Sequence, residues 1–440
     1  MRPQRFSVGM AVGNTFIGVV VYPYRTMEAY DFAYLESGVW RSEKYWVSHF
    51  NFDEEVVREN RFPAKVIFHD VTLRDGEQTP GVVLRKEEKI KIAQALDEAG
   101  VDRIEAGMPV VSEEDLTAIS DIVSLGLRAE IYAFCRMKYE DIDAALKTQV
   151  DNVIIEGPVG VPKIRYQHGW KAEQVVEAAL SSVQYALDHG LRVSFFGVDL
   201  TRGDYRFILH LFKKLEEVGV DGFVVADTYG SLTPEAARHL FRKLHSTLTK
   251  PLEFHGHNDF GLATATSIAA LASGASVVHV SVNGLGERAG NASLEELALS
   301  LKLLYGVEHS VKLDKLFNLS RLVEELTMVK VAYNKAVTGE RVFARESGVG
   351  VAGWMKYPLA AEPFLPEIVG NKDKIFIGKK SGRHSIEWKL KQLNLEATEE
   401  EIIEILRLVK DISEAKKAPL SDEEFLSIVK EVKQKRNKAT

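Results

Sequence analysis

Eight short apolar runs alternate with amphipathic stretches between residues 65 and 284, and this rhythm limits the possible folds more than any other feature. The runs have the length of buried β-strands, and the stretches between them, such as 86–100 and 204–219, place apolar residues at helical spacing. Several stretches end in glycine, a common helix terminator. The runs span residues 65–70, 102–109, 128–135, 152–158, 191–199, 221–228, 252–259 and 276–284.

Eight strand–helix repeats within roughly 250 residues predict an α/β fold, the (β/α)8 TIM barrel. The competing fold is an open, doubly wound sheet, which would carry a glycine-rich phosphate loop after its first strand. The segment after the first run, FHDVTLRDG (residues 68–76), contains no such loop. The barrel is therefore the predicted architecture.

The remainder of the chain predicts a mainly helical C-terminal cover. Residues 311–340 are expected to be helical, with a periodic pattern over 319–337, whereas residues 341–385 are rich in Gly and Pro and predict a loop-dominated cover. Residues 396–437 predict two charged helices with good N-caps. The expected division is an N-terminal extension (1–60), a catalytic barrel (61–310), a linker helix with cover subdomain (311–390) and a C-terminal helical subdomain (391–440).

Composition limits the classes of partner. The net charge of −7 and the pI near 6.0 provide no electrostatic footprint for nucleic acid or an acidic membrane surface. The single cysteine, Cys135, excludes a disulfide framework within the chain and a cysteine-rich zinc site. No apolar run reaches the length of a membrane span. We therefore expect neither nucleic acid nor a membrane as partner.

The N-terminal residues have a basic start and an apolar stretch, as a signal peptide does. Asn14 and Thr15 interrupt that stretch, and no small-residue cleavage site follows. The segment VGNT (12–15) instead predicts the turn of a hairpin between two short strands. We expect a cytoplasmic protein, with Met27 as an alternative start.

Polar residues collect at the predicted carboxyl ends of the strands, where TIM barrels place their active sites. His255 and His257 are two residues apart on one strand, so their side chains point to the same side. Neutral imidazoles suit divalent metals, and Asp75, after the first strand, can add an oxygen ligand. Such a set leaves positions open for substrate and water. The alternatives are two satisfied core histidines, and a strand-end salt bridge between Arg74 and Asp75.

Six ordered blocks between about residues 45 and 437 resemble the isopropylmalate and homocitrate synthase family, the metal-dependent DRE-type TIM barrels that also include hydroxymethylglutaryl-CoA lyase. The GERAGN segment favours the synthase branch, and residues 1–45 lie outside the resemblance. The blocks are HDVTLRDGEQTPG (69–81), IEAGMP (104–109), ADTYGSLTP (226–234), FHGHNDFGLA (254–263), NGLGERAGNASLEEL (283–297) and GKKSGRHSI (378–386).

The resemblance implies a Claisen-type condensation of acetyl-CoA with a 2-oxo acid, which gives a 2-hydroxy di- or tricarboxylate and CoA. It implies a divalent cation (Mg²⁺, Mn²⁺ or Zn²⁺), a homodimer whose cover regions exchange contacts, and a role in amino-acid biosynthesis. Arg74 matches the arginine that binds the keto oxygen, and Glu105 and Thr228 match polar residues of the keto-acid pocket. The implied metal ligands are Asp75, His255, His257 and Asn291, and further implied substrate-binding residues are Gln78, Lys138 and Arg345.

Two positions depart from the family pattern. Val198 stands where the synthases carry a glutamate, and Gly350 stands where they carry a histidine, the pair associated with moving the acetyl-CoA proton. Neither valine nor glycine can transfer a proton. The base has moved, with His69, Tyr229 and Glu287 as candidates; or the reaction differs, as in a retro-Claisen lyase; or the barrel binds metal without turnover.

The keto-acid pocket also departs from that of some relatives, because Lys138 replaces a histidine. With Arg136 and Arg345, it predicts a cationic pocket that suits a dicarboxylic 2-oxo acid such as oxaloacetate or 2-oxoglutarate. The alternative is that Lys138 is a solvated residue at a helix start.

Overall fold

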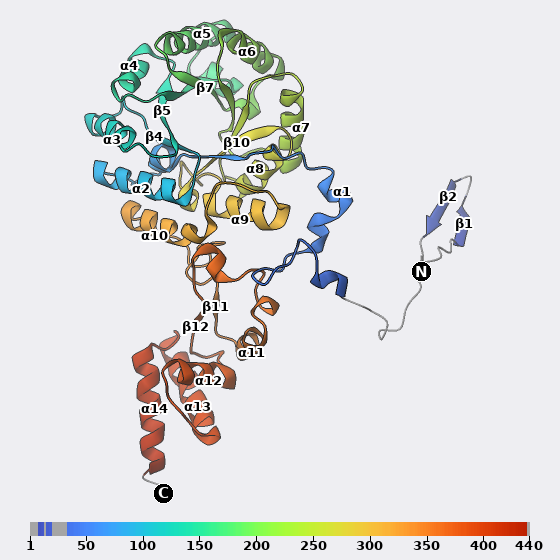
Figure 1. The fold of residues 1–440 in the computed structure, drawn as a ribbon, viewed down its shortest axis with the longest axis vertical. Helices are drawn as coiled ribbons and strands as arrows, with labels where there is room; N and C mark the ends of the chain where they lie inside the picture. Colours follow the sequence, from blue (N-terminus) through green and yellow to red (C-terminus); the bar gives the residue numbers. More distant parts are fainter. Residues whose placement is uncertain (1–7, 13–14, 20–32, 438–440) are drawn as a thin grey trace.

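The computed structural model describes residues 8–12, 15–19 and 33–437 (Figure 1). Strands β1 (Val8–Val12) and β2 (Thr15–Val19) pair antiparallel with Val12 opposite Thr15, as the hairpin prediction requires. The turn residues 13 and 14 lie outside the described residues, as does Met27. Among the described residues, no helix is both long enough and apolar enough to cross a bilayer.

Eight parallel strands close into a barrel in the order β10-β3-β4-β5-β6-β7-β8-β9, which confirms the predicted TIM barrel. Val, Ile and Phe dominate the strands because each strand is covered on both faces. The strands are β3 (Ile67–Asp70), β4 (Arg103–Gly107), β5 (Glu130–Arg136), β6 (Asn152–Pro158), β7 (Arg192–Val198), β8 (Gly222–Asp227), β9 (Leu252–Gly256) and β10 (Ala275–Val280).

A helix follows each strand, and the helices form the outer ring seen in Figure 1. Gly100 (φ 89°) and Gly219 (φ 108°) end α2 and α6 in the left-handed conformation, as the glycine pattern predicts. The ring contains α2 (Lys86–Ala99), α3 (Glu113–Ser124), α4 (Tyr139–Lys147), α5 (Ala172–Asp188), α6 (Tyr205–Val218), α7 (Pro234–His245), α8 (Ala263–Leu271) and α9 (Leu294–Tyr305).

The barrel has two apolar layers, because successive strand side chains point to opposite faces. One layer joins the strands to the helices and includes Val153, Ile155 and Phe195. The other fills the barrel interior and consists of Tyr132, Phe134, Ile154, Phe196, Val224 and Ala226. Side chains two residues beyond these interior positions therefore point into the mouth of the barrel.

The predicted helix over 311–340 is wrong in its second half. Helix α10 (Leu316–Thr327) ends at Met328, whose φ is 60°. The Glu324 carboxylate accepts the backbone N–H of Val331 at 3.1 Å, and the Thr327 hydroxyl accepts that of Val329 at 3.4 Å. Side chains thus take donors that a continuing helix would need. Periodicity alone does not reveal this competition.

The cover begins with short elements. Strands β11 (Ala344–Arg345) and β12 (Lys374–Ile375) pair parallel, and α11 (Gly348–Lys356) forms in a segment expected to be mainly loop. A short helix, α1 (Glu54–Val57), precedes the barrel.

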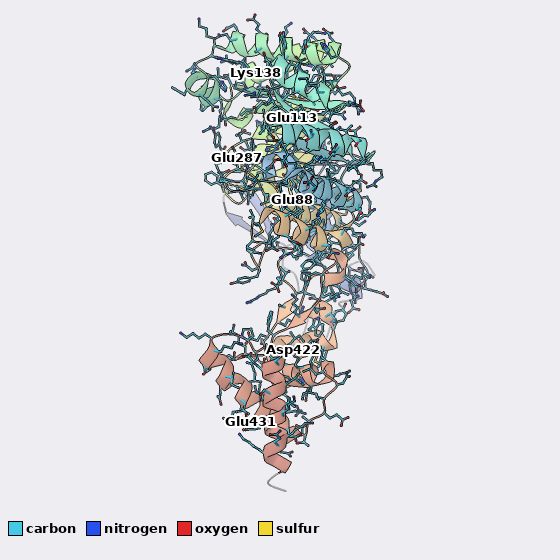
Figure 2. The ribbon with its side chains drawn as sticks, turned by 90° about the vertical axis from the view of Figure 1, so that its left-hand side faces the viewer. Glu88, Glu113, Lys138, Glu287, Asp422 and Glu431 are labelled. Atoms are coloured by element: carbon cyan, nitrogen blue, oxygen red, sulfur yellow. The ribbon has the colours of Figure 1, made fainter. Side chains whose placement is uncertain are left out.

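The two charged helices of the C-terminal region are confirmed as α13 (Glu399–Lys416) and α14 (Asp422–Asn437). With α12 (Arg383–Gln392) they enclose a separate apolar cluster that includes Val351, Ile405 and Phe425. Figure 2 shows the molecule as elongated, with Lys138 toward the barrel end and Asp422 and Glu431 toward the other. The domain boundaries at residues 61, 311 and 391 stay predictions.

Candidate active site at the mouth of the barrel

Three predicted metal ligands meet at the carboxyl end of the strands. Asp75, His255 and His257 are all buried, and each offers a ligand atom within 4.8 Å of the other two. Each histidine Nε2 lies 3.7 Å from Asp75 Oδ2, and the two Nε2 atoms lie 3.2 Å apart. Barrel closure brings Asp75 to the histidines, because β10 lies between β9 and β3.

The backbone around this cluster departs from regular strands. Asp75 lies in a π-helical turn over Thr72–Gly76, and His257 lies one residue beyond β9, where it forms a β-bridge with Asn291. The Asn291 amide donates to Asp75 Oδ2 and to the carbonyl of Leu285, while its Oδ1 is buried without a partner. An unpaired buried acceptor beside a carboxylate and two imidazoles fits a cation.

Gly286 leaves room for this arrangement. Its φ is 155°, and a Cβ there would lie 2.3 Å from Asn291 Nδ2 and 3.0 Å from Asp75 Oδ2. Any side chain at this position would therefore enter the cluster. The residues present fit a divalent cation held by Asp75, His255 and His257, with Asn291 beside them.

Electrostatics keeps the two histidines neutral, the form in which imidazole binds a metal. Burial and the neighbouring His257 hold the pKa of His255 well below its ordinary value. Burial also lowers the pKa of His257, although the Asp75 carboxylate opposes the shift.

Arg74 lies next to this cluster and is fixed from two sides. Its Nε donates to Glu105, and its Nη1 lies 3.3 Å from Asp75 Oδ1. The guanidinium stacks over the Phe134 ring at 4.1 Å and lies 5.8 Å from Phe196. Its Nη2 is buried without a partner, so a strong donor remains free beside the metal-ligand cluster.

A chain of buried ionisable groups runs below Arg74. Glu105 contacts His69 at 3.1 Å, His69 stacks on His279 at 4.2 Å, and His279 contacts Glu253 at 3.0 Å. Burial raises the pKa of Glu105, but Arg74 and His69 outweigh it and lower that pKa to about 2. Burial and His279 lower the pKa of His69 to about 4. Glu105 is therefore a charged support for Arg74.

Comparison with known proteins places this site in a family. Residues 65–323 match the family model described as HMGL-like, and residues 337–417 match the one described as homocitrate synthase post-HMGL domain-like. The chain belongs to the HMGL-like family. This confirms the resemblance seen in the sequence blocks.

Several curated members of the HMGL-like family are similar over most of this chain. Homocitrate synthase AksA of Methanothermobacter thermautotrophicus is 42% identical over 390 residues, 89% of this chain and 98% of that protein. (R)-citramalate synthase CimA of Methanocaldococcus jannaschii is 44% identical over 82% of this chain and 74% of its own length. A probable 2-isopropylmalate synthase of Methanopyrus kandleri is 45% identical over 80% of this chain and 70% of that protein.

Among solved structures, hydroxymethylglutaryl-CoA lyase from Pseudomonas aeruginosa aligns with a TM-score of 0.55 at 24% identity, covering 61% of this chain and 95% of that one. This likeness supports the barrel fold.

The predicted substrate-binding residues of this family member occupy different environments. Gln78 is exposed and lines a pocket of about 400 Å³ beside Arg74. The half-buried Thr228 follows β8, and its hydroxyl accepts the backbone N–H of Asp199 at 2.7 Å. Lys138 is exposed at the N-cap of α4, as its alternative interpretation expects, and also lines a second pocket.

The structure does not bring Arg345 to the barrel mouth. It lies on β11 in the cover, where its guanidinium pairs with Glu362 and, at 2.7 Å, with Asp373. Arg136 is likewise engaged by Asp141 at 2.8 Å. Two of the three cations that predict a cationic keto-acid pocket therefore have carboxylate partners within the chain.

The three residues named as replacement bases are poorly placed. His69 is fully buried below Arg74. Tyr229 lies among three cations, with Arg202 at 4.2 Å, Arg288 at 5.1 Å and Lys163 at 5.6 Å from its ring. The half-exposed Glu287 carboxylate pairs with Arg288 at 3.2 Å.

Sequence reasoning missed Glu156, at the carboxyl end of β6. It lines the second pocket, of about 310 Å³, together with Lys138, Lys163, Trp170 and Val198. The signal was present in the sequence, because a glutamate interrupts the apolar run NVIIEGP two residues after the inward-facing Ile154.

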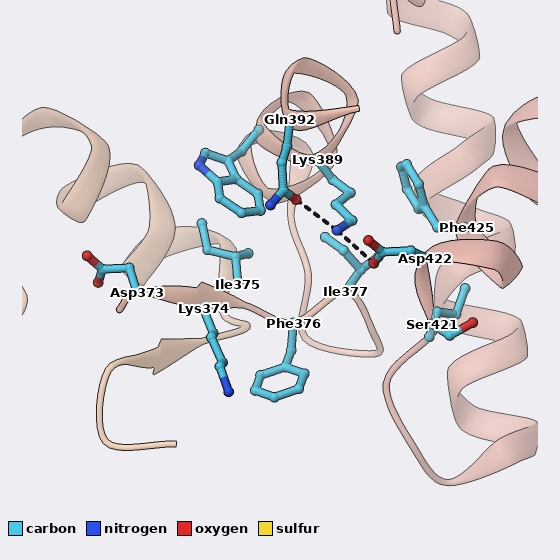
Figure 3. A pocket seen from close by; sticks show the side chains of 12 residues that line it. Asp373, Lys374, Ile375, Phe376, Ile377, Lys389, Gln392, Ser421, Asp422 and Phe425 are labelled. Atoms are coloured by element: carbon cyan, nitrogen blue, oxygen red, sulfur yellow. Dashed lines mark hydrogen bonds and ion pairs between the residues drawn. The ribbon is translucent and has the colours of Figure 1, made fainter. Parts of the chain in front are cut away.

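Another pocket, of about 240 Å³, lies in the C-terminal region (Figure 3). Phe376 and Phe425 contribute to its wall, and Lys389 pairs there with Asp422 at 2.8 Å. None of the residues predicted for metal or substrate binding lines it. The chemistry therefore belongs to the barrel mouth.

Proposed function

We propose that this HMGL-like protein condenses acetyl-CoA with a 2-oxo acid in a Claisen-type reaction that yields a 2-hydroxy di- or tricarboxylate and CoA. One observation carries the proposal: the partnerless Nη2 of Arg74 lies beside a buried Asp–His–His cluster suited to a divalent cation. The relatives named as homocitrate, citramalate and isopropylmalate synthases support the same reaction type.

The metal is part of this proposal. Asp75, His255 and His257 would hold the cation, with Asn291 as a further ligand, and Mg²⁺, Mn²⁺ and Zn²⁺ are the candidates. When bound, the cation would polarise the ketone of a chelated 2-oxo acid.

Arg74 supplies the second stabilising charge. Its guanidinium is fixed before substrate arrives by Glu105 and by the Phe134 ring. A donor held in place where an alkoxide develops stabilises the transition state without reorganisation. Glu105, fully buried below it, positions this arginine and has no access to substrate.

The identity of the 2-oxo acid follows less directly from the site. Because Arg136 and Arg345 are neutralised within the chain, the case for a second carboxylate on the substrate rests on Lys138. Monocarboxylic and dicarboxylic 2-oxo acids are therefore both candidates. Retro-Claisen cleavage uses the same charges in reverse and is the second candidate function, favoured by the absence of a proton-transfer group at Val198 and Gly350.

The test is thiol release from acetyl-CoA with Mg²⁺, Mn²⁺ or Zn²⁺ and pyruvate, 2-oxoisovalerate, oxaloacetate or 2-oxoglutarate, with product masses measured in parallel. Release with one acid, and a product heavier by an acetyl unit plus water, supports a synthase and identifies its substrate. Silence across the panel, with cleavage of a 3-hydroxyacyl-CoA, would instead support the lyase. Metal binding with neither activity would leave a metal-binding barrel without turnover.

The expected homodimer and cytoplasmic location accompany this proposal. Sedimentation of the full chain at micromolar concentration measures the first.

A further inference from the structure

The proposed condensation needs a base for the acetyl-CoA methyl group, and the position that family resemblance assigns to it is Val198. Most other carboxylates near the mouth are engaged. Glu105 is bound to Arg74, and Asp227 accepts from Thr201 at 2.8 Å and from two backbone N–H groups. Asp199 and Asp259 pair with Arg202 at 2.7 Å and Arg288 at 2.8 Å. These groups are held in structural roles.

Glu156 differs from them, since its side chain makes no hydrogen bond or ion pair with any residue that the structure describes. It stands on β6 two residues after Ile154, so its side chain points into the barrel, one layer nearer the mouth. The strand register pairs it with Arg136 on β5 and with Phe196 on β7. A free carboxylate therefore faces the mouth from the strand beside Val198.

The surroundings place Glu156 near the reacting centre. Phe196, its register neighbour, has its ring 5.0 Å from that of His255 and 5.8 Å from the Arg74 guanidinium. Glu156 and Val198 line the same pocket of about 310 Å³. A substrate methyl group that enters this pocket lies between the carboxylate and the Arg74 site.

The charges that face Glu156 also suit a base. Burial raises the pKa of its carboxyl, Asp141 adds to that rise, and the cations Arg74, Lys163 and Arg136 lower the pKa. Burial outweighs the cations, so the carboxylate is a stronger base than an exposed glutamate. A base with a pKa nearer the working pH transfers protons more efficiently.

We propose that Glu156 is the general base of the condensation, on the strand next to the family position occupied here by Val198. This inference rests on the proposed synthase function. A C–H bond of the acetyl methyl breaks, its proton goes to the Glu156 carboxylate, and its electron pair forms the enolate. The enolate carbon bonds to the ketone carbon, whose π electrons move to the oxygen beside Arg74. Water then hydrolyses the thioester to a carboxylate and the CoA thiol.

The test compares Glu156→Gln with the wild type, using acetyl-CoA and the 2-oxo acid that the wild type turns over. Glutamine keeps the shape and removes the base, so kcat should fall by about 10²–10⁴-fold, while KM for the 2-oxo acid and the metal content stay constant. Glu156→Asp keeps a carboxylate and should retain intermediate activity. The rate with trideuterated acetyl-CoA should show a larger isotope effect in the glutamine variant, because proton abstraction becomes rate-limiting.

The matched control is Glu177→Gln, the same chemical change at an exposed position on α5, which should leave kcat unchanged. A Glu156→Gln enzyme within threefold of the wild-type kcat would overturn the assignment of Glu156 and leave the synthase function intact. A loss of activity that accompanies a loss of bound metal would overturn it as well, since the role would then be structural. No thiol release by the wild type with any 2-oxo acid would overturn both proposals.

Discussion

Gly286→Ala should weaken metal binding without unfolding the barrel. The backbone at Gly286 has φ 155°, a conformation that costs a residue with a Cβ about 1–3 kcal/mol. The new methyl would lie 2.3 Å from Asn291 Nδ2 and 3.0 Å from Asp75 Oδ2, so both side chains must move. Asn291 has little freedom, because it is buried and bonded to Asp75 and Leu285.

The size of the effect follows from what Asn291 and Asp75 do. Disturbing groups that orient metal ligands typically costs about 10–100-fold in metal affinity. We expect a loss in this range for Mn²⁺ or Zn²⁺, measured by isothermal titration of chelator-treated protein. Thermal unfolding in the presence and absence of metal should show a smaller stabilisation by metal in the variant than in the wild type.

Gly126→Ala is the matched control. Gly126 also has a positive φ, 62°, but a Cβ there meets nothing within 4 Å. This variant should lose stability through backbone strain, about 1–2 kcal/mol, and bind metal as the wild type does. If Gly286→Ala also bound metal with wild-type affinity, the cluster around Asp75 would not be the metal site, and the reasoning would fail.

Three further predictions follow from the same geometry. His257→Ala should lose the bound divalent ion and keep the far-UV circular dichroism of the wild type; full retention of metal by elemental analysis would refute the ligand assignment. Arg74→Lys should lower kcat by about 10²–10³-fold at unchanged metal content, because an ammonium cannot donate to Glu105 and to a substrate oxygen in one rigid plane; steady-state kinetics decides, and a loss below tenfold would argue against this role. Because the pKa of His69 falls from 6.5 to about 4 on folding, its contribution to stability is complete above pH 6.5 and is lost as the pH falls toward 4, on the order of 3 kcal/mol. Urea unfolding at pH 7 and pH 5 should therefore differ less in His69→Gln than in the wild type, and an equal difference in both proteins would contradict the assignment.

The barrel was predictable because its signals are local. Each strand is a short apolar run and each helix an amphipathic stretch, so the alternation is visible without knowledge of contacts. The same local signals failed at α10, where the apolar periodicity continues past Thr327 but the helix does not. There, Glu324 and Thr327 accept backbone N–H groups in a geometry that no periodic pattern contains.

The site was partly predictable for a related reason. Residues at strand ends share one face of a barrel, so Asp75, His255, His257 and Asn291 were expected together, and the structure brings them together. Arg345 was assigned by motif alone, and the structure places it in the cover with two carboxylate partners.

Glu156 shows the opposite case. Its position in the run NVIIEGP was readable, but its significance depends on which carboxylates already have partners, and only the folded chain provides that information.

The sequence by itself determined the element order, the barrel and the face on which the chemistry lies, because these depend on periodicities of two and 3.6 residues along the chain. The tertiary structure alone decided which charges are spent on one another. Arg136 and Arg345 are neutralised, Glu105 is fixed under Arg74, and Glu156 is left free. The physical reason is that ion pairing acts over a few ångströms in space between residues far apart in the sequence, and in a buried site it determines which groups remain available for chemistry.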